Sequence, residues 1–120
     1  MFDNFKAMGA IAGLMKNKER LAEAGERVRD RLQRTKVTGE AQGGLVRVVV
    51  TGELLVESIE VAPALGAGFA SDDRSMAEAL VVEATNNAIH AARDRMQEII
   101  REEASALGIE LPPEIGRFLT

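Results

Sequence analysis

The stretch TKVTGEAQGGLVRVVVTGELLVESIEV, from Thr35 to Val61, decides the fold of this chain of 120 residues. It contains three short runs rich in Val, Ile and Thr, residues that favour β-strands. Two turns that contain glycine, Gln42–Gly44 and Gly52–Glu53, separate the runs. Connections this short force neighbouring strands to be antiparallel. We therefore predict a three-stranded antiparallel sheet with strands at 37–41, 45–51 and 55–61.

Apolar residues occupy both faces of the predicted sheet. Successive side chains of a strand point to opposite faces, so Val46, Val48 and Val50 share one face while Val49 lies on the other. The third strand likewise carries apolar residues at odd and at even positions. The chain's own helices can cover one face. The other face needs a second layer, and a second copy of the chain is its simplest source, which predicts a homodimer.

A long helix is predicted on each side of the sheet. Residues 5–34 are rich in Ala, Leu, Lys, Arg and Glu and contain no Pro, which favours a helix. Residues 72–107 have a similar character; Ser75–Glu78 matches a capping box near their start, and Gly108 is a typical stop. Residues 64–70 are predicted to be a loop. The prediction is one α+β domain over residues 1–120 with the order α-β-β-β-α: a helix at about 5–34, a sheet at about 35–61, a helix at about 72–107 and an extended tail at 108–120.

The composition argues against several classes of function. The absence of Cys excludes disulfides and thiolate chemistry and fits a reducing cytoplasm. No apolar run reaches the roughly 18 residues that cross a membrane. The only histidine, His90, lies mid-helix without a catalytic partner, and Asp72–Asp73 lacks a third metal ligand at a defined spacing. We expect no enzyme, no metal, no cofactor, no small-molecule substrate and no membrane association.

The net charge of −4 is unevenly distributed. Residues 1–36 hold nine Lys/Arg and five Asp/Glu, a net charge of +4, so any nucleic-acid surface should involve the first third of the chain. A rotation of about 100° per residue places five cations of the first helix within a stripe roughly 60° wide, opposite an apolar seam. This spacing suits contacts with phosphates. The five cations are Lys16, Arg20, Arg27, Arg31 and Arg34.

The alternative interpretation of this stripe is a solvated helix face. Glu23 lies inside the stripe, and the pairs Glu23–Arg27 and Asp30–Arg34 have the i,i+4 spacing that neutralises charge locally. The acidic balance of the chain and the apolar seam also permit another function, a non-enzymatic dimeric adaptor that binds a protein partner through its helices. No aromatic residue interleaves with the stripe, so contact with a nucleic-acid backbone is expected rather than base stacking.

A series of short motifs adds a second line of inference through its order and spacing. The motifs are VTGE (37–40), GLVRV (44–48), Gly52, SIEV (58–61) with Pro63, NNA (86–88) and LPP (111–113). In this order, over nearly the whole chain, they resemble the YbaB/EbfC family of small bacterial nucleoid-associated proteins.

The resemblance implies an intertwined homodimer of α-β-β-β-α protomers, with long helices that project from a sheet core. It implies binding of double-stranded DNA with little sequence preference in the bacterial cytoplasm and nucleoid, with effects on chromosome organisation, gene expression or DNA repair, and no catalysis. The family's DNA contacts are attributed to basic residues on the projecting helices. Those that carry over are Lys16, Lys18, Arg20, Arg27, Arg31 and Arg34 on the first helix and Arg93, Arg95 and Arg101 on the second.

Overall fold

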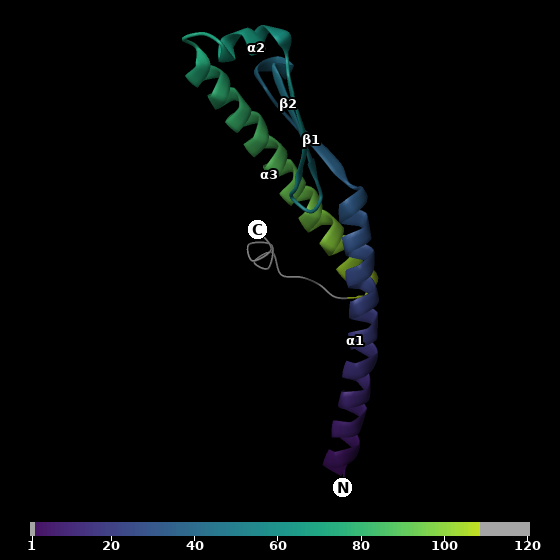
Figure 1. Ribbon diagram of the computed structural model, residues 1–120. Helices are drawn as coiled ribbons and strands as arrows, with labels where there is room; N and C mark the ends of the chain where they lie inside the picture. The colour runs from purple at the N-terminus through teal and green to yellow at the C-terminus, as the bar shows by residue number, and fades with distance from the viewer. Residues whose placement is uncertain (1, 109–120) are drawn as a thin grey trace.

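The computed structural model describes the backbone of residues 2–108 and the side chains of residues 17–108. Its order of elements confirms the predicted α-β-β-β-α arrangement, with two short additional helical segments (Figure 1). The predicted tail lies almost entirely outside the described residues. The elements are α1 (Phe2–Arg34), β1 (Lys36–Ala41), the 3-10 turn η1 (Gln42–Gly44), β2 (Val46–Thr51), β3 (Val56–Val61), α2 (Pro63–Phe69) and α3 (Arg74–Ala106).

The segment between the sheet and α3 corrects two predictions. Residues predicted to be a loop form α2, because Pro63 at the first helical position has a φ already suited to a helix and Leu65 is buried in the core. The predicted capping box is also wrong. Helix α3 begins at Arg74, which places Ser75 inside the helix, and Glu78 forms an ion pair with Arg74 at 3.6 Å. The stop at Gly108 is confirmed, with a φ of 75° just beyond the helix.

The three strands form one antiparallel sheet in the order β1-β2-β3, as predicted. Val48 of β2 lies between Gly39 of β1 and Ile59 of β3. An irregularity at Val49/Val50 shifts the register with β3, as a β-bulge does. The turn into β2 requires glycine, because Gly44 has a φ of 96°.

The core lies between one face of this sheet and α3. The helix packs chiefly on β1 and β2, and it meets them with small side chains. Gly39 shows how close the approach is, because a Cβ atom there would lie 2.2 Å from the backbone nitrogen of Ala88. The fully buried residues where α3 covers the sheet include Val46, Val48, Val50, Ala84, Ala88 and Ala92.

The uncovered apolar surface of the sheet differs from the prediction. Val56, Ile59 and Val61 of β3 pair with the buried valines of β2 and therefore share the core face, but they are 47%, 48% and 38% exposed. The opposite face is largely polar and carries an Arg47–Glu40 ion pair at 3.0 Å. The sheet therefore does not have two apolar faces. Its uncovered apolar residues form a strip along the β3 edge of the core face.

Helix α1 gives the molecule its length. Figure 1 shows α3 running along the sheet and meeting α1 near its own C-terminal end, while the N-terminal half of α1 continues alone. The molecule measures 80 × 24 × 18 Å, and its radius of gyration is 21.6 Å. A compact domain of this length would have a radius of gyration of roughly 14 Å. None of the helices formed by residues 2–108 combines the length and apolarity of a membrane span.

Candidate nucleic-acid interface

The rotation of α1 about its axis decides which of its cations are available. Ala24 is 6% exposed, and Val28 and Arg31 are partly buried where α1 meets α3. Leu21 of the predicted apolar seam is instead 52% exposed. The prediction that the basic stripe lies on the exposed side, opposite the packing side, is therefore wrong for part of the stripe.

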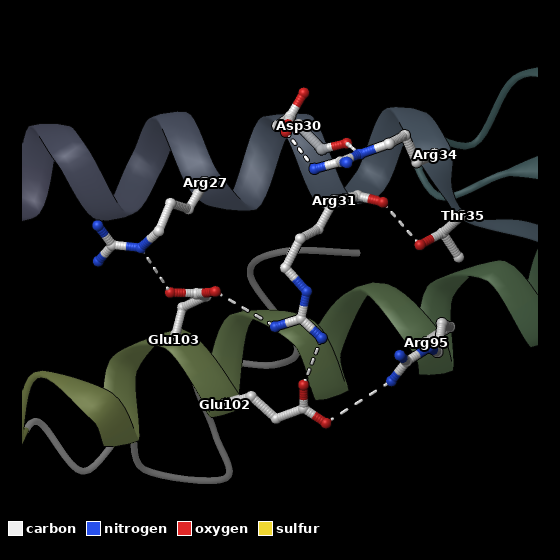
Figure 2. A network of polar contacts seen from close by, with 8 residues as sticks. All are labelled: Arg27, Asp30, Arg31, Arg34, Thr35, Arg95, Glu102 and Glu103. Atoms are coloured by element: carbon white, nitrogen blue, oxygen red, sulfur yellow. Dashed lines mark hydrogen bonds and ion pairs between the residues drawn. The ribbon is translucent and has the colours of Figure 1, made fainter.

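Two arginines of the stripe point at α3 and bind its carboxylates (Figure 2). Arg27 donates from Nε to Oε2 of Glu103 at 3.1 Å. Arg31 donates from Nη2 to Oε2 of Glu102 at 2.6 Å and from Nη1 to Oε1 of Glu103 at 3.3 Å. The carboxylates near the C-terminal end of α3 thus attract Arg27 and Arg31, and the rotation of α1 points both arginines toward them.

A third arginine completes this group. Nη1 of Arg95 lies 3.7 Å from Oε1 of Glu102 and 3.1 Å from Oε2 of Glu98. We call Arg27, Arg31, Arg95, Glu102 and Glu103 the inter-helix cluster. Its members differ in accessibility, since the side chain of Glu103 is 14% exposed and that of Glu102 is 46% exposed.

The contacts in this cluster shift the pKa values of Arg31, Glu102 and Glu103. The hydrogen bond from Arg31 lowers the pKa of Glu102, and the hydrogen bond from Arg27 lowers the pKa of Glu103. The hydrogen bond to Glu102 in turn raises the pKa of Arg31. Each of these shifts favours the ionised form of its group.

Arg34 is also paired, but within its own helix. It forms an ion pair with Asp30, and its Nε donates to the carbonyl oxygen of Asp30 at 3.4 Å. The local neutralisation expected for Asp30–Arg34 is therefore confirmed. That expected for Glu23–Arg27 is wrong, because Arg27 reaches Glu103 on α3 instead.

The other predicted cations are in different states. Lys18 and Arg20 on α1 and Arg101 on α3 are exposed and form no ion pair within the described part of the chain. Arg93 is partly buried, and its Nε atom is buried without a hydrogen-bond partner in the structure. The side chain of Lys16 lies outside the described residues. The structure does not bring these residues together into one compact site.

One candidate cation was missed by the sequence pattern. Arg29 is exposed and, among the described side chains, has no ion-pair partner. It lies almost opposite Arg27 around the helix and hence outside the predicted stripe. It shares its side of α1 with Lys18, eleven residues away, and this spacing was the available signal.

The accessible cations suit contacts with phosphates. The guanidinium group of an arginine can bind a phosphate through two hydrogen bonds, and the ammonium group of a lysine acts as a point charge. They are spread along a rod, which favours contact with an extended polyanion over a small ligand. Among residues 17–108, no group of three or more His, Asp or Glu side chains is placed to hold a metal ion.

Comparison with known proteins places this geometry in context. Residues 8–107 match the model of the YbaB/EbfC DNA-binding family. A nucleoid-associated protein of Pseudomonas fluorescens is 34% identical over 104 residues, which cover 87% of this chain and 91% of that protein. A nucleoid-associated protein of Neisseria meningitidis serogroup C is 32% identical over 108 residues, or 90% of this chain and 93% of the relative.

A solved structure supports the fold alone. The crystal structure of an uncharacterized protein from Helicobacter pylori aligns with a TM-score of 0.58 at 17% sequence identity. The alignment covers 74% of this chain and 87% of that one.

Proposed function

Because the chain belongs to the YbaB/EbfC DNA-binding family, we propose that it acts as a nucleoid-associated protein that binds double-stranded DNA with little sequence preference. The proposed role is one of binding without catalysis, in the cytoplasm and nucleoid, by residues 1–120 acting as one domain. One structural observation carries the proposal. Helix α1 projects beyond the sheet and carries exposed cations, Lys18, Arg20 and Arg29, that form no ion pairs within the described residues.

The proposed contacts are with phosphates, which carry no sequence information and therefore predict little sequence preference. The accessible cations of α1, joined by Arg101 and Arg93 on α3, contact the DNA backbone, and Lys16 extends the same set. Arg27, Arg31, Arg34 and Arg95 remain candidates, but each must first leave a carboxylate. Because the net charge is −4, the molecule as a whole does not attract a polyanion. Attraction of DNA therefore depends on where the accessible cations lie.

We further propose that the active form is a homodimer. The strip formed by Val56, Ile59 and Val61 is about half exposed along an edge strand. An exposed apolar edge of this kind is an aggregation hazard unless another chain covers it. A second copy that covers the strip also doubles the number of projecting α1 helices. The dimer thereby brings the cations of two α1 helices to one duplex.

Fluorescence anisotropy of a labelled duplex between about 50 and 200 mM salt tests the DNA-binding proposal. Binding should weaken steeply with salt. The plot of log K, where K is the association constant, against log salt should become shallower by about 0.9 for each phosphate contact removed. Replacing Lys18, Arg20 and Arg29 by Gln should therefore flatten the slope. The matched control replaces Lys36, Arg47 and Arg74, which form ion pairs elsewhere on the molecule, by Gln. Absence of binding at about 50 mM salt, or equal slopes for both triple variants, contradicts the proposal.

A specific observation favours the adaptor as a second candidate function. Leu21 is 52% exposed on α1, while two basic residues of the same helix, Arg27 and Arg31, are engaged with α3. A pull-down from lysate after nuclease treatment separates the two functions. Retention of one defined protein partner supports the adaptor, whereas loss of all bound material supports DNA binding.

A further inference from the structure

We propose that Glu102 and Glu103 of α3 are an internal competitor of DNA, which holds Arg27 and Arg31 of α1 away from phosphates. The inference rests on the proposed function and adds a regulatory contact to it. These two arginines belong to the stripe predicted from the sequence to face phosphates, yet in the structure both are engaged with carboxylates of the same chain.

The geometry of the contact resembles phosphate recognition. Arg31 uses its two terminal nitrogens on two separate carboxylates, at 2.6 Å and 3.3 Å, as an arginine fork does on two phosphate oxygens. Arg27 uses its Nε on Glu103. The donors that a phosphate would need are therefore those that the carboxylates occupy. DNA and the α3 carboxylates cannot hold them at the same time.

The inter-helix cluster is accessible enough for phosphates to displace the carboxylates from the arginines. Arg27 is 49% exposed and Glu102 is 46% exposed, and ion pairs that involve groups this exposed contribute little to stability. Only Glu103, at 14% exposed, is shielded from solvent. A duplex with its dense row of phosphates can thus draw the arginines away.

Opening the cluster does not require the helices to separate. Ala24 remains buried, and Gly52 lies directly against the backbone of Leu32, where an added Cβ would be 2.7 Å from its carbonyl oxygen. These contacts hold the C-terminal part of α1 in place by packing. Arg95 already lies 3.7 Å from Glu102 and can neutralise that carboxylate when Arg31 leaves it (Figure 2). The contact can therefore open by side-chain movement alone.

The test compares the salt dependence of duplex binding in three variants with that of the wild-type protein. Glu102→Gln/Glu103→Gln frees both arginines and should raise the affinity at about 100 mM salt by about tenfold and steepen the slope by up to about 1.8. The control Glu83→Gln/Asp94→Asn removes the same charge from exposed α3 positions that form no ion pairs within residues 17–108. It should raise affinity less and leave the slope unchanged.

A quadruple variant identifies the source of the gain. Adding Arg27→Gln and Arg31→Gln to Glu102→Gln/Glu103→Gln should return the slope to the wild-type value, because the freed donors are gone. A gain that survives in the quadruple variant, or that the control reproduces, overturns the inference. Circular dichroism checks that each variant folds. Glu102→Gln alone, at the more exposed position, provides a second test with an expected steepening of less than about 0.9, because Arg31 keeps its contact with Glu103.

The two proposals fail in different ways. If neither the wild-type protein nor Glu102→Gln/Glu103→Gln binds duplex DNA at about 50 mM salt, the proposed function is wrong and the competition is wrong with it. If the wild-type protein binds and the Glu102→Gln/Glu103→Gln slope equals the wild-type slope, only the competition is overturned. If only Glu102→Gln/Glu103→Gln binds, the competition is supported, and the proposed function is contradicted because the wild-type protein does not bind duplex DNA.

Discussion

At the scale of single residues, two glycines determine how closely the helices approach the sheet. A Cβ atom on Gly39 would lie 2.2 Å from the nitrogen of Ala88 and 2.5 Å from the carbonyl oxygen of Ala84. A Cβ atom on Gly52 would lie 2.7 Å from the carbonyl oxygen of Leu32. Gly39 therefore sets the distance of α3 from the sheet, and Gly52 sets the position of the base of α1.

We predict that Gly39→Ala destabilises the protein by about 3 kcal/mol, because the added methyl group meets backbone atoms that cannot move aside as a side chain would. Urea unfolding followed by circular dichroism measures the change. The matched control is Gly25→Ala in α1, where an added Cβ has nothing within 4 Å. The control should stabilise the protein by up to about 1 kcal/mol. Equal effects of the two substitutions would contradict the packing argument.

The inter-helix cluster predicts a pH dependence of stability. The pKa values of Glu102 and Glu103 are lowered in the folded protein, chiefly by hydrogen bonds from Arg31 and Arg27. A carboxyl group with a lowered folded pKa stabilises the fold above its unfolded pKa of about 4.3 and loses this contribution as the pH falls through the folded pKa. The stability difference between wild type and Glu102→Gln/Glu103→Gln should therefore shrink between pH 6 and pH 3.

Urea unfolding at several pH values measures that difference. Glu83→Gln/Asp94→Asn is the control, since these carboxylates form no ion pair among the described side chains. A difference that grows as the pH falls would show that the cluster does not stabilise the fold through its ionised carboxylates.

At the scale of elements, the orientation of α1 and the position of β3 determine which surfaces remain exposed. Helix α1 has 33 residues and is roughly 50 Å long, far longer than its contact with α3. Strand β3 lies beyond the part of the sheet that α3 covers. One element therefore projects a charged surface, and the other leaves an apolar strip uncovered.

We predict that Ile59→Glu converts a dimer into a monomer at micromolar concentration, because it places a charge in the middle of the uncovered strip. Size-exclusion chromatography with light scattering gives the mass. The control is Ser58→Glu, which adds the same charge on the opposite face of the same strand. A monomeric wild-type protein, or dimers in both variants, would remove β3 as the dimer interface.

At the scale of the whole molecule, shape and charge act together. The body is 80 Å long, and its positive charge is concentrated in residues 1–36. A single copy offers few accessible cations against an overall charge of −4. Joining two copies brings two sets of cations to one duplex, so that the second set binds at high effective concentration.

We predict that Ile59→Glu weakens duplex binding at about 100 mM salt by about 100-fold, because a monomer loses this avidity. Ser58→Glu carries the same added charge and keeps the dimer, so its affinity should change far less. Fluorescence anisotropy on one duplex long enough for both helices measures both variants. A monomeric Ile59→Glu protein that binds as tightly as Ser58→Glu would show that each copy binds DNA on its own.

The sequence by itself determined the elements and their order. Runs of Val, Ile and Thr between glycine turns specify the strands of 36–61, and uninterrupted helix-forming residues specify α1 and α3, because these preferences are local. Gly108 was predictable as a helix stop for the same reason. Local pattern also identified most candidate cations.

Only the tertiary structure decided which surfaces meet. The register shift at Val49/Val50, the side of α1 that faces α3 and the pairing of Arg27 with Glu103 depend on contacts between distant parts of the chain. Arg27 and Glu103 are 76 positions apart, and Glu23 offered a nearer partner at a favourable helical spacing. Exposed ion pairs differ little in free energy, so local spacing does not select among them. Packing of α1 beside Gly52 and against α3 makes that selection, and it thereby settles which cations remain accessible.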